Sequence, residues 1–136
     1  MTRQDRQGVR AVRAVGPQTT HQISAAVLAG GVMHATVIPV DLESGVFADG
    51  PIETQARQAF QNLQALLREA GGDMDDVVHL TIYLVDSKDM PGLNDVYKEF
   101  FFHEPYPARA TIVVRELVGP PGLRIETTAQ AYLSEA

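Results

Sequence analysis

Residues 51–70 constrain the fold most, because a single apolar stripe runs along them at helical spacing. Pro51 suits the first position of a helix, and Glu53 favours its positive N-terminal end. Gly71-Gly72 can end the helix in a left-handed conformation. Burying the stripe requires the face of a sheet opposite it. The stripe consists of Ala56, Ala59, Phe60, Leu63, Leu66, Leu67 and Ala70.

A second helix is predicted over residues 88–102, and six further segments have the patterns of strands. Residues 16–20 and 29–31 are expected to be turns, the latter through its paired glycines. The order β-β-β-α-β-α-β-β predicts a mixed sheet with both helices on one side. The expected strands cover 8–15, 21–28, 32–40, 76–85, 108–117 and 123–133.

Asn94 lies on the apolar face of the second predicted helix. That face is otherwise formed by Met90, Leu93, Tyr97, Phe100 and Phe101. An amide on an apolar stripe needs hydrogen-bond partners. Two interpretations stay open: Asn94 satisfies backbone groups of a nearby loop, or it helps to shape a binding site.

The strand over 76–85 predicts that the sheet has two different faces. Its core face would contain Val78, Leu80, Ile82 and Leu84. The opposite face, with His79, Thr81 and Tyr83, is too polar for a dry core and too apolar for open water. A half-apolar sheet face of this kind usually meets a partner, so we expect an oligomer.

Composition excludes several classes of protein. A chain of 136 residues suits one domain, expected over residues 1–136 with 1–7 as a flexible N-terminus. The net charge of −6 argues against nucleic acid as a partner. No apolar run approaches the roughly 20 residues that a membrane span needs. No signal-peptide core follows the polar start, so a cytoplasmic protein is expected.

No nucleotide-binding or nucleophile motif is present. The sequence contains neither a Gly-x-Gly-x-x-Gly, nor a P-loop, nor a Gly-x-Ser-x-Gly elbow, and it has no cysteine. The four histidines, His21, His34, His79 and His103, lie far apart, without companions at ligand spacing. We therefore predict neither a metal site nor a cofactor.

Arg109 and Glu126 are the candidates for chemistry. Pro107 suits the start of a strand, which places Arg109 at the mouth of that strand, where a guanidinium can bind a carboxylate through two hydrogen bonds. Both residues could instead be ordinary exposed charges. If the two terminal strands form a hairpin, their register decides whether the side chains converge. A guanidinium paired with a water-orienting carboxylate would suit hydrolysis of a small anionic substrate.

At these residues the chain resembles the RidA (YjgF) family of reactive-intermediate deaminases, from Gly16 to its end. Five segments are similar to family landmarks. They are Ala29-Gly30-Gly31 with Ile38-Pro39-Val40-Asp41; residues 55–63 of the first helix; Asn94-Asp95-Val96-Tyr97 with Phe100-Phe101; Tyr106-Pro107-Ala108-Arg109; and Ile125-Glu126 with Ala129 and Ala131.

This resemblance implies a chorismate-mutase-like α+β fold and a homotrimer whose sheets form a central barrel. It places the sites in clefts between subunits and implies hydrolysis of 2-aminoacrylate-type enamines or imines to a 2-keto acid and ammonia. By resemblance, Arg109 holds the substrate carboxylate and Glu126 positions the attacking water. Asn94 borders the cleft, and Thr111 takes a cleft position that is often cysteine in relatives.

The chain departs from the family at two places. Gly16-Pro17-Gln18 stands where deaminases usually have Gly-Pro-Tyr, and Ala35-Thr36-Val37 replaces a Ser-Gly-Gln segment. Thr36 and Val37 would therefore line the substrate site where the family uses glycine, and a β-branched residue there would crowd a ligand. Three functions stay open: a 2-aminoacrylate deaminase, a hydrolase of a different imine or enamine acid, and a non-enzymatic trimer that binds a metabolite or a partner protein.

Overall fold

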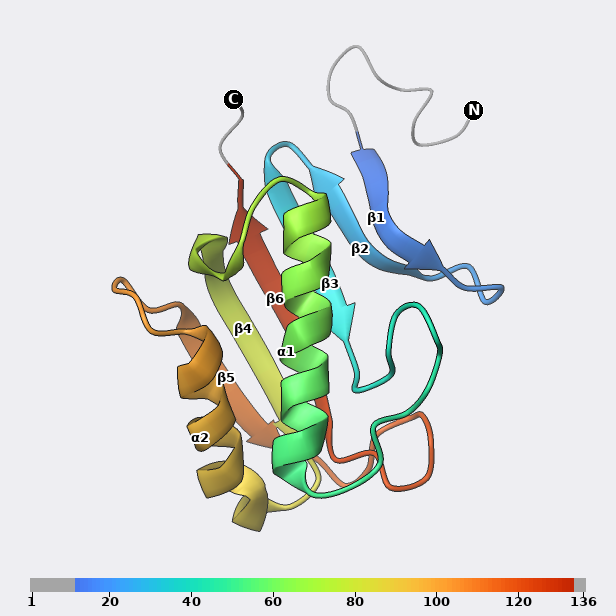
Figure 1. Cartoon of the computed structure of the whole chain (residues 1–136), viewed down its shortest axis with the longest axis vertical. Coiled ribbons are helices and arrows are strands. Elements are labelled where there is room, and N and C mark those ends of the chain that lie inside the picture. Colours follow the sequence, from blue (N-terminus) through green and yellow to red (C-terminus); the bar gives the residue numbers. More distant parts are fainter. Residues whose placement is uncertain (1–11, 134–136) are drawn as a thin grey trace.

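The computed structural model describes residues 12–133, which form one mixed sheet covered on one face by two helices (Figure 1). The predicted flexible segment 1–7 and the first four residues of the predicted strand 8–15 lie outside the described residues. The strands lie in the order β1-β2-β3-β6-β4-β5. Their bounds are Val12–Gln18, Ser24–Ala29 and Val32–Val37 for β1 to β3, and Val77–Leu84, Ala108–Val113 and Ile125–Tyr132 for β4 to β6.

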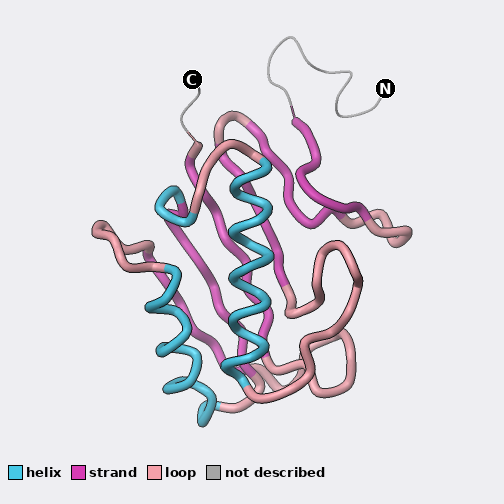
Figure 2. The backbone as a smooth tube through the Cα atoms, viewed as in Figure 1, coloured by secondary structure: helices cyan, strands magenta, loops and turns pink. Residues whose placement is uncertain are grey.

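The helices are α1, Ile52–Glu69, and α2, Met90–Phe100, and both pack on the same face of the sheet (Figures 1 and 2). This confirms the predicted layer arrangement. After α1, Gly71 adopts a φ of +95° and the N–H of Gly72 bonds to the carbonyl of Leu67 at 2.8 Å, which is a Schellman ending. Within the described part of the chain, neither helix is long and apolar enough to cross a membrane.

The last two strands do not form a hairpin, because β4 lies between β5 and β6. β5 pairs in parallel with β4, and β6 pairs antiparallel with both β4 and β3. A parallel pair needs a crossover, and α2 supplies it between β4 and β5. The hairpin considered for the two terminal strands is therefore absent, and Arg109 and Glu126 do not lie on adjacent strands.

A bulge near the start of β4 places Val78 on the exposed face of the sheet instead of in the core. The pairing of β4 with β6 shifts between Val77 and His79, so two successive residues of β4 face away from the helices. Val77 is buried, whereas Val78 is 52% exposed. The prediction of Val78 in the core was wrong, while Leu80, Ile82 and Leu84 are fully buried as expected.

The start of the sheet also differs from the predicted pattern. β1 extends through Gly16 and Pro17 to Gln18, where a turn was predicted. Its pairing with β2 is irregular between Val15 and Gln18, and Gly16 adopts a φ of +76°. A glycine bulge thus lets the strand continue through residues that usually mark its end.

Two buried amides fix the loops at the C-terminal edge of β3 and before β6. Gln55 donates to the carbonyls of Gly50 and Gly122 at 3.0 and 2.9 Å and accepts from the N–H of Arg124 at 2.8 Å. Asn62 donates to the carbonyls that flank Pro39, those of Ile38 and Val40. The sequence prediction missed their burial, although each lies at helical spacing from apolar residues of α1.

Candidate active site

Arg109 lies on the edge strand β5 and points toward α2. It is aligned with buried Leu80 of β4, so its side chain is on the helix-covered face. Its Nη2 donates to Oδ1 of Asn94 at 2.8 Å, and its Nε donates to Oγ1 of Thr111 at 2.9 Å. The structure thus brings together three residues that were predicted separately as site residues. For Asn94, this contact favours the interpretation in which the amide shapes a binding site.

The ring of Tyr97 contacts one face of the same guanidinium. The Cζ atom of Arg109 lies 4.5 Å from the centre of the Tyr97 ring, a cation–π contact. That ring stacks on Phe101 at 4.5 Å and meets the edge of fully buried Phe60 of α1 at 6.0 Å. The role of Tyr97 was not predicted, although it follows Asn94 by one turn of the same helix.

A pocket of about 520 Å³ opens beside Arg109. Burial lowers the pKa of the Arg109 guanidinium, and the neighbouring Tyr97 partly offsets the effect. The arginine still carries its charge at neutral pH. Its Nη1 has no hydrogen-bond partner among residues 12–133, so it can bind an anionic group. The pocket is lined by Asn94, Tyr97, Lys98, Phe101, Phe102, Tyr106 and Arg109.

Glu126 lies on the opposite face of the sheet. It is aligned with Tyr83 of β4, which in turn is aligned with Ile112 of β5, so all three point away from the helices. Glu126 is half-buried, and burial raises the pKa of its carboxyl above the usual value. Within one chain the sheet therefore separates this carboxylate from the guanidinium of Arg109.

The two residues that replace the family glycine segment face different ways. Thr36 is exposed and aligned with Thr128, two residues beyond Glu126 on the open face. Val37 is only 3% exposed and packs in the core. A contact between Val37 and a ligand would therefore have to come from its backbone.

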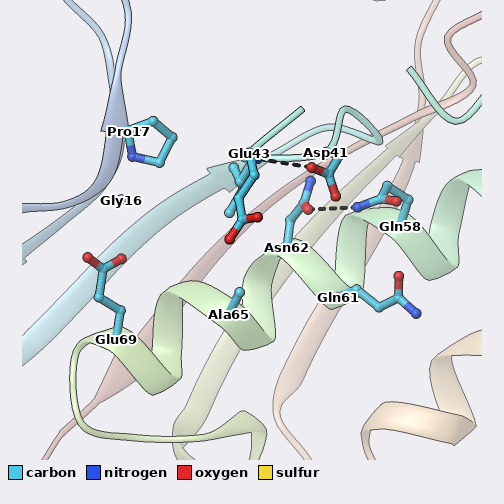
Figure 3. A pocket seen from close by; sticks show the side chains of 10 residues that line it. Gly16, Pro17, Asp41, Glu43, Gln58, Gln61, Asn62, Ala65 and Glu69 are labelled. Carbon is cyan, nitrogen blue, oxygen red and sulfur yellow. Dashed lines mark hydrogen bonds between the residues drawn. The ribbon is translucent and has the colours of Figure 1, made fainter. Parts of the chain in front are cut away.

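A second hollow, of about 610 Å³, lies between α1, the end of β1 and the loop after β3 (Figure 3). Asp41, Glu43 and Glu69 line it, and none of its described lining residues is basic. The hydrogen bond from the Ser44 backbone is the main cause that lowers the pKa of the Asp41 carboxyl, so this group stays ionised. An anionic substrate would be repelled here and attracted to the pocket of Arg109.

Across residues 12–133, no three His, Asp or Glu side chains come close enough to hold a metal ion. What the site offers is a fixed cation beside an apolar pocket, and a carboxylate of raised pKa on the far side of the sheet.

Comparison with known proteins assigns the family. A family model described as "Endoribonuclease L-PSP" matches residues 14–133. The chain belongs to the RidA family. A RidA-family relative in Dermatophagoides farinae, named 2-iminobutanoate/2-iminopropanoate deaminase, is 37% identical over 82% of this chain and 86% of its own. A human protein of the same name is 36% identical over 90% of this chain and 84% of its own.

Solved RidA-family structures share the fold. RidA from a Psychrobacter species superposes with a TM-score of 0.79 at 31% identity, covering 89% of this chain and 99% of its own. A Rid-family protein from Yersinia pestis gives a TM-score of 0.82 at 29% identity, over 90% and 100% of the two chains. E. coli TdcF, solved with bound serine, gives 0.79 at 26% identity, over 90% and 99%.

Proposed function

We propose that this RidA-family protein hydrolyses reactive 2-imino acids and their enamine tautomers, such as 2-aminoacrylate, to 2-keto acids and ammonia. The observation that carries the proposal is the guanidinium of Arg109, held by Asn94, Thr111 and the ring of Tyr97 at the wall of a pocket. A guanidinium fixed at three points is preorganised to bind a carboxylate.

Two similarities support this substrate class. Relatives at 36–37% identity are named as deaminases of 2-iminobutanoate and 2-iminopropanoate. TdcF was solved with serine, a small molecule that carries a carboxylate beside a nitrogen-bearing carbon. The net charge of −6 does not favour the ribonuclease activity in the family description, since a nucleic-acid surface is normally basic.

The chemistry needs little beyond orientation and proton transfer. An enamine first becomes an imine by moving a proton from nitrogen to the terminal carbon. Water then adds to the carbon of the C=N bond while the nitrogen gains a proton. The resulting carbinolamine collapses to a C=O bond as the C–N bond breaks and ammonia leaves. Because an imine is already electrophilic, no covalent intermediate with the protein is required.

In this scheme Arg109 binds the carboxylate and Glu126 positions the water and moves protons. The two side chains lie on opposite faces of one sheet, so one copy contributes Arg109, Asn94 and Thr111 and a neighbouring copy contributes Glu126. Thr36 shares the open face with Glu126 and would enter the site from the same copy. We expect three copies in a ring, with each site between two neighbours.

The open sheet face supplies surface for such contacts. Exposed apolar side chains on β4, β5 and β6 include Val78 at 52% and Ile112 at 43%. Exposed apolar surface of this kind marks an interaction site. A RidA-like ring would cover this face with neighbouring copies.

A coupled assay tests the function. A pyridoxal-phosphate-dependent lyase acting on serine generates 2-aminoacrylate, and the added rate of pyruvate formation is followed with wild type and with Arg109→Ala. Acceleration by wild type alone is expected. No acceleration by a folded, assembled wild-type protein would exclude deamination of 2-aminoacrylate. A pyruvate-induced rise in melting temperature that Arg109→Ala abolishes would then indicate a binding role.

A further inference from the structure

Two histidines, His34 and His79, lie in one row across the open face of the sheet, on strands next to β6 (Figure 1). His34 of β3 and His79 of β4 are both aligned with Gln130 of β6, one on each side of it. Their strand neighbours Met33 and Leu80 are buried on the helix-covered face, so both imidazoles point the other way. Aligned side chains have Cβ atoms about 5 Å apart, so this histidine pair flanks the amide of Gln130.

Within the strands, no carboxylate lies beside the histidine pair. Glu126 is the only acidic residue of the six described strands, and it stands four residues along β6 from the aligned glutamine, about 13 Å away. Tyr83 and Tyr132 share the open face, but phenols ordinarily titrate well above neutral pH. The basic residues of the strands, Arg13 and Arg109, lie on the helix-covered face.

The acidic residues just before β4 are engaged elsewhere. Asp75 lies 3.1 Å from Nδ1 of His103, and Asp76 accepts from the N–H of Asp73 at 2.9 Å. The side-chain ion pairs of residues 12–133 include neither member of the histidine pair. A proton on either imidazole is therefore a charge that its own chain does not compensate.

We propose that His34 and His79 make the assembly sensitive to pH, so that acidification separates the copies and with them the two halves of each site. This inference rests on the ring of copies in the proposed function and concerns its regulation. Neighbouring copies in the ring cover the open face, and loss of water there disfavours a charged imidazole. Histidine ordinarily gains its proton between about pH 8 and about pH 5. Separate copies then take up more protons than assembled copies, so the assembly weakens as pH falls.

Two other effects of acidification act in the opposite direction. Burial favours the protonated form of Glu126, so covering this carboxyl becomes easier at lower pH. The net charge of −6 becomes less negative, which reduces repulsion between copies. Salt at about 0.15 M screens that repulsion beyond about 8 Å. Dissociation on acidification would thus have the sign expected of the imidazoles and not of these two effects.

The test measures the oligomeric state of the full chain at about pH 7.5 and about pH 5.5, in salt of about 0.15 M. Sedimentation is followed over a dilution series, and urea is added where the assembly survives the highest dilution. We expect the protein concentration at the midpoint of dissociation to be at least about tenfold higher at the lower pH. Where urea is needed, its midpoint concentration should be lower at the lower pH.

Replacement of both histidines by glutamine, the residue already between them in the row, removes their titration. The His34→Gln/His79→Gln variant should keep its midpoint within about twofold between the two pH values, and each single variant should shift by an intermediate amount. The matched control is His21→Gln/His103→Gln, because these histidines lie in the β1–β2 turn and beside Asp75. The control should respond to pH as wild type does.

The outcomes distinguish this inference from the proposed function. A wild-type assembly that is equally stable at both pH values would overturn the inference and leave the deaminase function standing. A double variant that still dissociates on acidification would do the same. If the double variant does not assemble at the higher pH, the single variants decide, and an undiminished shift in both overturns the inference. A wild-type chain that is monomeric at the higher pH would overturn the shared site of the proposed function, and the inference with it.

Discussion

Arg109 and Glu126 project from opposite faces of the same sheet, and strand β4 separates their strands. Arg109 is aligned with Leu80, which faces the helices, whereas Glu126 is aligned with Tyr83, which faces away from them. No side-chain rotation brings the two groups together through a packed sheet. Joint action on one small molecule therefore requires a second copy of the chain.

Replacement of Arg109 by lysine tests the importance of guanidinium geometry. Arg109→Lys keeps a positive charge but cannot bond to Asn94 and Thr111 while also presenting two parallel donors to a carboxylate. We expect kcat/KM in the coupled assay to fall about 100-fold. Arg68→Lys, on an exposed arginine near the end of α1, is the control. Near-normal activity of Arg109→Lys would show that charge alone suffices.

Two substitutions at Asn94 should differ in severity. Asn94→Ala removes the acceptor 2.8 Å from Nη2 of Arg109 and should lower kcat/KM about tenfold by loosening the guanidinium. Asn94→Asp places a carboxylate at the same position, where it competes with the substrate for the arginine. The melting-temperature shift produced by pyruvate should therefore shrink more in Asn94→Asp than in Asn94→Ala. The reverse order would argue against carboxylate binding at Arg109.

The pH profile should report the ionisation of Glu126. Burial raises the pKa of this carboxyl above the usual value, and only the ionised form can accept a proton from water. Activity should thus fall on the acid side at a pH above that expected for an exposed glutamate. Because the folded chain holds this proton more tightly than the unfolded chain, ionisation lowers the free energy of unfolding as pH rises through that range.

Glu126→Gln tests whether Glu126 causes both the loss of activity at acid pH and the decline in stability as pH rises. The variant should lose most of the activity at every pH, and its stability should lack the decline with rising pH that Glu126 causes. Kinetics and urea unfolding, measured between about pH 4 and about pH 8, would show the loss of activity and the missing decline in stability. An unchanged acid limb in the residual activity would assign that limb to another group.

Gln55 should contribute strongly to stability without touching the pocket of Arg109. Gln55→Ala leaves two carbonyls and one N–H without their partner in the interior. The free energy of unfolding should fall by about 3 kcal/mol, measured in urea at fixed protein concentration. Gln61→Ala is the matched control, because Gln61 is an exposed glutamine on the same helix. Equal stability of the two variants would contradict this role.

Local patterns predicted the elements well, because helix periodicity and glycine turns depend on neighbouring residues. The bulge that exposes Val78 escaped prediction, since it arises from pairing with β6, a strand almost fifty residues later. The position of β4 between β5 and β6 likewise depends on pairing between strands that are far apart in the sequence. Treating the segments around α2 as one β-α-β unit would have predicted the parallel pairing of β5 with β4, but not the pairing of β6 with the other edge of β4.

The sequence indicated most residues of the candidate site, but not how those residues are arranged in space. Arg109, Asn94 and Thr111 were each selected from the sequence, and the structure brings them within hydrogen-bond distance. Tyr97 was assigned to an apolar stripe and to a family motif but not to the site, because spacing cannot distinguish a core ring from one that contacts a cation. The separation of Glu126 by the sheet could not be predicted, since it depends on strand order.

Subunit complementation addresses the shared site. Arg109→Ala and Glu126→Gln chains are assayed alone, and then after unfolding and refolding together in equal amounts. In a randomly mixed ring, about a quarter of the sites pair an intact Arg109 with an intact Glu126 of the next copy. The mixture should therefore recover about a quarter of the wild-type rate, while each variant alone stays near the uncatalysed rate. A mixture as inactive as the separate variants, in assemblies shown to contain both chains, would contradict a site built from two copies.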